Sequence, residues 1–208
     1  MSCTIAHYCK IVNHRVLKDG QLLFDSPEST FQHFSDAAYR YLQINYPKYH
    51  KMDNLCKLGL LASDILLNTS NLKIIASAEK TGVILSNRSS SLDTDVKYSD
   101  MVKSGVASPA VFVYSLPNIV IGEICIRNGI KGENTFFISD RYDIPGQVNY
   151  INMLFENREI DACIGGWMEL IGENYEAFLY LAVRSKPEQE NKQQPHTVEI
   201  IKKIYLNK

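Results

Sequence analysis

Residues 135–165, TFFISDRYDIPGQVNYINMLFENREIDACIG, decide the fold class of this chain. Thr135 to Ser139 predicts a short strand, and Ile160 to Gly165 predicts a second one. Asp143 and Pro145 open a helix between them. The apolar positions of this helix fall on one face, at Val148, Ile151, Leu154 and Phe155. A strand, a helix and a strand in this order are typical of an α/β fold.

The same alternation extends in both directions from this unit. Apolar residues at helical spacing predict a helix over 52–68, and Asp19-Gly20 marks a hairpin turn near the N-terminus. The other predicted strands are 4–12, 15–24, 72–85 and 178–184; the other predicted helices are 115–128 and a short one from Ser29 or Thr30 to Ile44. We expect a mixed, mostly parallel sheet covered by helices.

Several signals mark where elements begin and end. Ser115 is expected to cap its helix, and Gly165-Gly166 is expected to end its strand. Residues 87–95 are polar and Ser-rich, which predicts a loop. From residue 185 the chain is polar. We therefore expect one domain over 1–184, then a linker and C-terminal segment over 185–208, whose last part could be a helix or a strand.

Composition excludes several classes of protein. The chain has 208 residues, 45% hydrophobic and 22% charged, as in ordinary globular domains. Its 22 basic and 23 acidic residues give a net charge of −1, which argues against nucleic-acid and membrane-surface partners. No apolar stretch approaches the roughly 20 residues of a membrane span, and no signal peptide is recognised. The five cysteines are widely spaced and form no disulfide framework, so we expect a cytoplasmic protein.

The cysteines and one histidine are the first candidates for chemistry. Cys3, His7 and Cys9 share one parity on a predicted strand, so they would lie on one face. Their spacing matches no common zinc site, and we expect no metal. Cys125 and Cys163 lie in apolar segments, so we expect buried apolar side chains rather than nucleophiles.

Two polar segments are the other candidates. Gly129-Ile-Lys-Gly132 lacks the spacing of a phosphate-binding loop and leads into a strand. We expect a plain turn there, and no cofactor. Asp140-Arg141-Tyr142-Asp143 follows the end of a strand, where α/β proteins place ligand sites. A simple loop with Asp143 as a helix cap is the alternative.

Several segments taken together resemble the N-terminal half of the β-ketoacyl synthases, the condensing enzymes of the thiolase-like fold. The shared motifs, in this order, are Ser-Pro-Ala-Val-Phe-Val-Tyr-Ser-Leu-Pro-Asn (108–118), Gly122-Glu123, Gly129-Ile-Lys-Gly132 and Ile-Asp-Ala-Cys-Ile-Gly-Gly (160–166). The resemblance covers roughly residues 50–184. It implies that the chain forms a thiolase-like half.

Two departures from the family pattern bear on activity. Counted from the glycine motifs, the position of the family's nucleophilic cysteine falls on Asp140 or Arg141. Neither side chain attacks a thioester as a cysteine does. The family's two histidines and lysine come from a C-terminal half that has no counterpart here. Whether the chain is an enzyme is open, and the resemblance implies that it is inactive alone.

A half-length ketosynthase without the cysteine is similar to the short chain-length-factor-like proteins of aryl-polyene-type clusters. This implies a subunit that pairs with a full-length type II β-ketoacyl synthase in fatty acid or polyene biosynthesis, with acyl carrier protein as a further partner. Such a subunit would shape the acyl tunnel of its partner. The interface candidates are Thr135, Phe136, Phe137 and Ile138. The acyl-tunnel candidates are Asn118, Arg141, Tyr142 and Asp143.

Two alternatives stay open. The chain could be a half-sized acyl-thioester enzyme, in which Arg141 holds a carboxylate and Tyr142 or Asp143 assists proton transfer. It could instead be a homo-oligomeric binding protein without acyl chemistry. A nucleophile or base in the 139–145 loop would favour an enzyme, whereas an apolar interface would favour a subunit.

Overall fold

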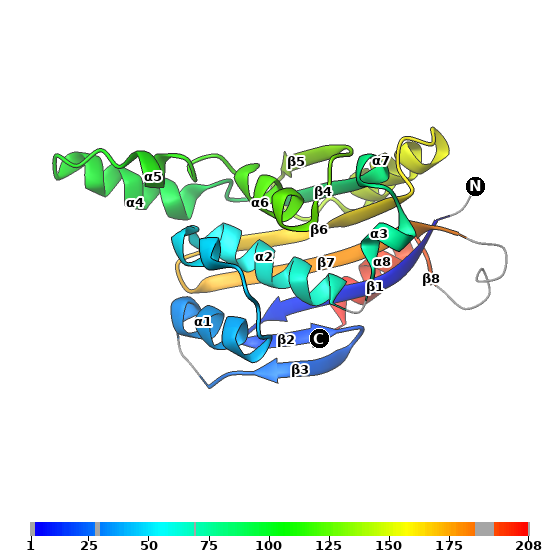
Figure 1. The fold of residues 1–208 in the computed structure, drawn as a ribbon, viewed down its shortest axis with the longest axis horizontal. Helices are drawn as coiled ribbons and strands as arrows, with labels where there is room; N and C mark the ends of the chain where they lie inside the picture. Colours follow the sequence, from blue (N-terminus) through cyan, green and yellow to red (C-terminus); the bar gives the residue numbers. More distant parts are fainter. Residues whose placement is uncertain (1–2, 28–29, 69, 186–193, 208) are drawn as a thin grey trace.

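The computed structural model describes residues 3–27, 30–68, 70–185 and 194–207, and shows one sheet with helices on both faces (Figure 1). The strands are β1 (Cys3–Val12), β2 (Arg15–Lys18), β3 (Gln21–Asp25), β4 (Thr81–Asn87), β5 (Asn134–Ile138), β6 (Ala162–Ile171), β7 (Asn174–Arg184) and β8 (Gln194–Pro195). The helices are α1 (Phe31–Tyr41), α2 (Asn54–Leu67), α3 (Leu72–Ile75), α4 (Leu92–Lys103), α5 (Pro109–Phe112), α6 (Ile119–Asn128), α7 (Ile144–Glu156) and α8 (Val198–Leu206), with short 3-10 turns η1 (Pro47–Lys51) and η2 (Ala78–Lys80).

The sheet is mixed, with the strand order β3-β2-β1-β7-β6-β4-β5 and β8 beside β1. The predicted mixed sheet covered by helices is therefore confirmed. The predicted excess of parallel pairing is wrong. β4 pairs in parallel with β5 and β6, whereas the other described pairings are antiparallel. Short turns at Asp19-Gly20 and Gly172-Glu173 join consecutive strands, and a short turn permits only antiparallel pairing.

One face of the sheet carries the larger apolar cluster, beneath α1, α2 and α6 (Figure 1). The helix predicted over 52–68 is confirmed as α2, which is buried on most sides. Asp53 caps this helix by accepting a hydrogen bond from the amide of Cys56 at 2.9 Å. Because α2 packs against β1, β6 and β7, its apolar residues form the centre of this cluster.

The opposite face is covered by α7 and α8. The predicted cap of α7 is confirmed, since Asp143 accepts a hydrogen bond from the amide of Gly146. The segment after Thr197 is a helix rather than a strand, and it buries Ile201 and Ile204 in the same cluster as α7. The predicted polar linker lies mostly in 186–193, outside the described residues.

The strand predicted over 72–85 is wrong in its first half. Residues 72–75 form α3, where the amide of Ala76 bonds to the carbonyl of Leu72, and Ile74 is 79% exposed. The strand begins at Thr81, where the backbone pairs with β5 and β6 and every residue is buried. The apolar residues at 72–75 therefore did not indicate a strand, whereas those at 83–85 did.

Two predicted boundaries near α4 and α6 are also wrong. The Ser-rich stretch over 87–95 is only partly a loop, because α4 begins at Leu92 with Asp93 and Asp95 in its first turn. Ser115 does not cap α6. Its hydroxyl donates to the carbonyl of Phe112, and Asn118 occupies the cap position without a side-chain cap bond.

The Gly165-Gly166 pair does not end its strand, because β6 continues to Ile171 and pairs with β7. A Cβ atom on Gly165 would lie 2.5 Å from Cζ of Tyr180 on the neighbouring strand. Gly166 has a φ of +155° and approaches the backbone of β7 closely. These glycines allow strand contact rather than strand termination.

The N-terminal prediction is largely confirmed. Asp19-Gly20 turns between β2 and β3, and the two predicted strands become three. Thr30 caps α1, and Ser29 lies outside the described residues. Within the described part of the chain, no helix is long and apolar enough to cross a bilayer.

Candidate functional site

The loop 139–143 lies between β5 and α7, at the carboxyl ends of the parallel strands β4 and β5. The amide of Ser139 donates to the carbonyl of Asn87 at the end of β4, at 3.0 Å. The Ser139 hydroxyl donates to the carbonyl of Arg141 at 2.8 Å. The first bond holds the loop against β4, at the edge of the sheet where ligand sites of α/β folds lie, and the second lies within the loop.

The predicted tunnel residues occupy different environments. Asp140, Arg141 and Asp143 are exposed, and no carboxylate of the described residues forms an ion pair with Arg141. Asp143 is engaged as the helix cap. Asn118 is exposed at the start of α6 and lies on another element. The loop therefore brings together three of the four candidates, and only Tyr142 points into the protein.

Tyr142 belongs to a polar network beneath the loop, centred on Gln147 of α7. The hydroxyls of Tyr142 and Tyr180 donate to Oε1 of Gln147 at 2.7 and 3.3 Å. Nε2 of Gln147 donates to the carbonyl of Gly166 at 2.9 Å. Burial raises the pKa of the Tyr142 hydroxyl well above its usual range. It stays protonated near neutral pH and serves as a hydrogen-bond donor.

His196 extends this network toward the N-terminal strand. Its Nε2 lies 3.2 Å from the Tyr180 hydroxyl, and its Nδ1 lies 2.7 Å from Oδ1 of Asn152. The same Asn152 oxygen accepts from Sγ of Cys3 at 3.2 Å. The histidine is 3% exposed, and burial lowers its pKa to about 4. It therefore stays neutral down to a lower pH than an ordinary histidine does.

The thiols do not provide a nucleophile. Burial raises the pKa of Cys3 and Cys125 to about 11, and raises that of Cys9, Cys56 and Cys163 further. Cys163 is fully buried and Cys125 half-buried, as expected for small apolar side chains. The thiolate is the reactive form of cysteine, so none of the five is activated.

Cys3 and Cys9 do not share a face of the sheet, which corrects the parity argument. The register between β1 and β7 shifts between Ile5 and His7, so the alternation of side chains is interrupted. Cys3 joins the α7 side and Cys9 the α2 side, while His7 bonds to Asp19 at 2.8 Å. The described residues contain no group of three ligands that could hold a metal ion.

The interface candidates lie on β5, the edge strand of the described sheet. One side of β5 pairs with β4, and no described strand covers its other side. Phe136 packs on the α2 side, whereas Phe137 and Ile138 are 39% and 51% exposed. Thr135 bonds to Glu133 at the start of the strand. The edge therefore presents unpaired backbone groups and two apolar side chains.

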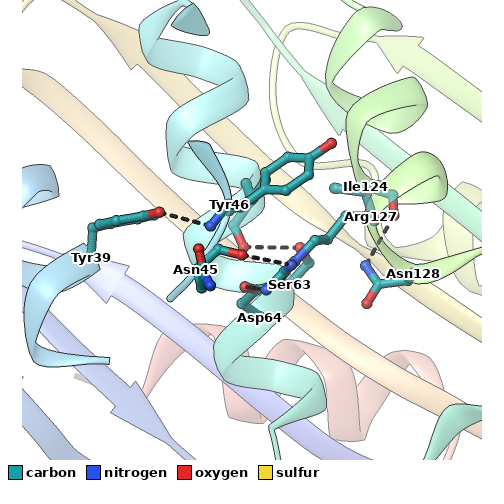
Figure 2. Close-up of polar contacts among 9 residues, drawn as sticks. Tyr39, Asn45, Tyr46, Ser63, Asp64, Ile124, Arg127 and Asn128 are labelled. Atoms are coloured by element: carbon teal, nitrogen blue, oxygen red, sulfur yellow. Dashed lines mark hydrogen bonds and ion pairs between the residues drawn. The ribbon is translucent and has the colours of Figure 1, made fainter. Parts of the chain in front are cut away.

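A separate hollow of about 480 Å³ opens between α2, α6 and the segment after α1. Figure 2 shows Arg127 of α6 directed at Asp64 of α2 and at the carbonyl of Asn45. Nη2 of Arg127 lies 2.9 Å from Oδ2 of Asp64, and its guanidinium lies 5.0 Å from the centre of the Tyr46 ring. The charged groups of this hollow neutralise each other, so it offers no activated group.

The sequence analysis missed two features, the polar network around Gln147 and the helix α4. Gln147, Tyr180 and His196 are far apart in the chain, and only the packing of α7, β7 and the segment before α8 joins them. The helix α4 was hidden by its Ser-rich start, although Asp93 and Asp95 are typical of the first turn of a helix.

The comparisons place this geometry among known folds. No family model matches the chain, and no curated protein matches it. The ishigamide ketosynthase/chain length factor is similar to it in structure, with a TM-score of 0.67 and 18% identity over 94% of the chain. The chain has the thiolase-like ketosynthase fold. It spans 64% of the length of that relative.

Two further structures are similar. The ketosynthase ApeO in complex with its chain length factor ApeC, from Xenorhabdus doucetiae, gives a TM-score of 0.57 at 10% identity, covering 90% of this chain and 81% of that one. A β-ketoacyl synthase from Burkholderia phymatum gives 0.65 at 10% identity, covering 94% and 62%. The resemblance seen in the sequence motifs is thus confirmed at the level of the fold.

Proposed function

We propose that this chain is a non-catalytic, chain-length-factor-like subunit that pairs with a type II β-ketoacyl synthase and shapes its acyl tunnel. The observation that carries the proposal is the free edge of β5, with exposed Phe137 and Ile138. An unpaired, apolar edge strand is a liability that proteins normally cover. Pairing with a partner strand would cover it.

The neighbouring helices add to the same kind of surface. Figure 1 shows α4 and α5 projecting beyond the rest of the molecule. They and the turn that follows them expose several large apolar side chains, namely Val96, Val102, Val106, Phe112, Val113 and Leu116. Exposed apolar groups of this number mark an interaction site rather than scattered surface residues.

The loop 139–143 supports the non-catalytic part of the proposal. Asp140 and Arg141 stand at the position that the sequence motifs assign to the nucleophile. Tyr142 is held as a donor by Gln147, and Asp143 is held as a helix cap. The described thiols are not activated, so the loop and its surroundings provide no thiolate that attacks a thioester.

Co-expression with a ketosynthase from the same cells tests the pairing. We expect a 1:1 complex by size-exclusion chromatography with light scattering. Phe137→Asp should prevent it, because a charge would be buried at the interface. Leu22→Asp is the matched control: Leu22 is 55% exposed on β3, the opposite edge strand, and its replacement should leave pairing intact.

Other outcomes would contradict the proposal. A stable homodimer that ignores the ketosynthase and is disrupted by Phe137→Asp would make this edge a self-association surface. Acyl-thioester turnover by the isolated chain, abolished by Arg141→Ala, would make the chain an enzyme. A folded Phe137→Asp variant that still pairs would place the interface elsewhere.

A further inference from the structure

A second cavity, of about 250 Å³, lies between α1, the start of α2, α4 and α5. None of the residues of the 139–143 loop lines it. Its charged lining residues are Lys51, Lys57, Lys97, Asp53 and Asp93, with His50 at one side. It is smaller than the cavities that hold drug-sized molecules, so it fits a small ligand.

Lys57 is the unusual member of this wall. The residue is 7% exposed, and its ammonium donates to Oε1 of Gln32 at 3.1 Å. It lies 5.7 Å from the centre of the Tyr49 ring. No carboxylate of the described residues forms an ion pair with it. An ammonium has three donors, and the contact with Gln32 is its one hydrogen bond among the described residues.

The side chain of Gln32 is oriented so that its oxygen accepts a hydrogen bond from Lys57. Its amide nitrogen donates to Oδ2 of Asp36 at 2.8 Å, which turns its oxygen toward the ammonium. Burial lowers the pKa of Lys57, Lys97 adds to that effect, and Asp36 and Asp53 oppose it. A bound anion would restore the missing counter-charge.

The two acidic groups of the wall are already engaged by the protein. Asp53 accepts from the amide of Cys56 and from the hydroxyl of Thr94, at 2.9 and 2.7 Å. Asp93 accepts from the amide of Gly172 and from the side chain of Asn54, at 2.8 and 3.1 Å. Both carboxylates are therefore held by donors of the fold.

The remaining lysines of the cavity lining are exposed. Lys51 and Lys97 are exposed, and neither forms an ion pair with a carboxylate of the described residues. They line the same cavity as Lys57. A ligand with more than one negative charge can contact the buried and the exposed ammonium groups together.

We infer that this cavity binds a small, multiply charged anion, with Lys57 as its buried contact and Lys51 and Lys97 as its exposed ones. The anionic groups are phosphates or carboxylates. This inference is independent of the pairing through β5, because it rests on a different part of the chain.

Calorimetric titration of the full chain at low ionic strength tests it, with sodium pyrophosphate in one arm and sodium citrate in the other. We expect saturable binding of one equivalent. The stronger arm identifies the phosphate or the carboxylate class. Lys57→Gln should weaken binding by about tenfold or more, because a charged hydrogen bond is lost.

Lys103→Gln is the matched control, since it removes the same charge from the end of α4 outside the cavity. It should leave the affinity unchanged. Lys97→Gln, an exposed replacement on the same helix, should weaken binding by roughly threefold and decides the question if Lys57→Gln does not fold. Absence of saturable binding in both arms, or equal weakening by Lys103→Gln and by the cavity variant, would overturn the inference.

Discussion

The side-chain nitrogen of Gln147 on α7 lies 2.9 Å from the carbonyl oxygen of Gly166 on β6. This bond ties the helix to the sheet directly below the loop 139–143. Because the oxygen of the same amide accepts from Tyr142 and Tyr180, one side chain satisfies three buried groups. Gln147 therefore holds the loop from below through Tyr142, in addition to the bond of Ser139 to β4.

Replacing Gln147 with Leu should destabilise the protein by about 2–4 kcal/mol, because the Tyr142 hydroxyl loses its partner, and the Tyr180 hydroxyl and the Gly166 carbonyl each lose one of two. Urea unfolding followed by circular dichroism measures this. Asn149→Leu, on the exposed side of the same helix, is the control and should change the free energy of unfolding by less than about 0.5 kcal/mol. An equal change in the free energy of unfolding in the two variants would show that the network around Gln147 does not stabilise the protein.

Two glycines should respond to alanine with opposite signs. Gly165→Ala places a methyl group 2.5 Å from Cζ of Tyr180, which we expect to cost about 2 kcal/mol or more. Gly122→Ala in α6 meets nothing within 4 Å and should stabilise by about 0.5–1 kcal/mol through helix propensity. Thermal unfolding of both variants measures the difference. Unchanged stability in Gly165→Ala would contradict the packing described for Gly165, and destabilisation by Gly122→Ala would contradict the open surroundings of Gly122.

The buried His196 should make stability depend on pH. Its pKa is lowered from 6.5 to about 4 in the folded protein, so between these values the unfolded chain binds the additional proton. Stability is therefore complete above about pH 6.5 and is lost as the pH falls toward 4. We expect His196 to account for about 2–3 kcal/mol of that loss.

His196→Gln keeps an acceptor or donor near Tyr180 but does not titrate. The variant should show a flatter profile of unfolding free energy between pH 4 and 6.5 than the native protein. Parallel profiles for the native protein and His196→Gln would refute this assignment.

The ion pair of Arg127 and Asp64 should stabilise the protein more than an exposed pair. Their side chains are 28% and 13% exposed, and Arg127 makes two bonds to the carboxylate (Figure 2). Arg127→Gln should cost about 1–2 kcal/mol. Arg15→Gln removes a pair whose members are 59% and 47% exposed, and should cost less than about 0.5 kcal/mol. A double-mutant cycle with Asp64→Asn isolates the coupling.

The sequence by itself determined the elements whose signals are local. The helix at α2 follows from its apolar spacing, the start of α7 follows from Asp143 and Pro145, and the turn at Asp19-Gly20 follows from its residue types. The order of motifs from 108 to 166 resembled that of the β-ketoacyl synthases, and the structural comparisons confirm the fold that this resemblance implied.

Only the tertiary structure decided which segments become neighbours. The register shift in β1 places Cys3 and Cys9 on opposite faces of the sheet. The close pairing of β6 with β7 explains Gly165-Gly166, which by its residue types alone predicts the end of a strand. The contacts of Gln147 with Tyr180, and of Lys57 with Gln32, join residues from different elements. Such contacts depend on how whole helices and strands pack against one another. Local residue preferences do not encode the position of one element relative to another.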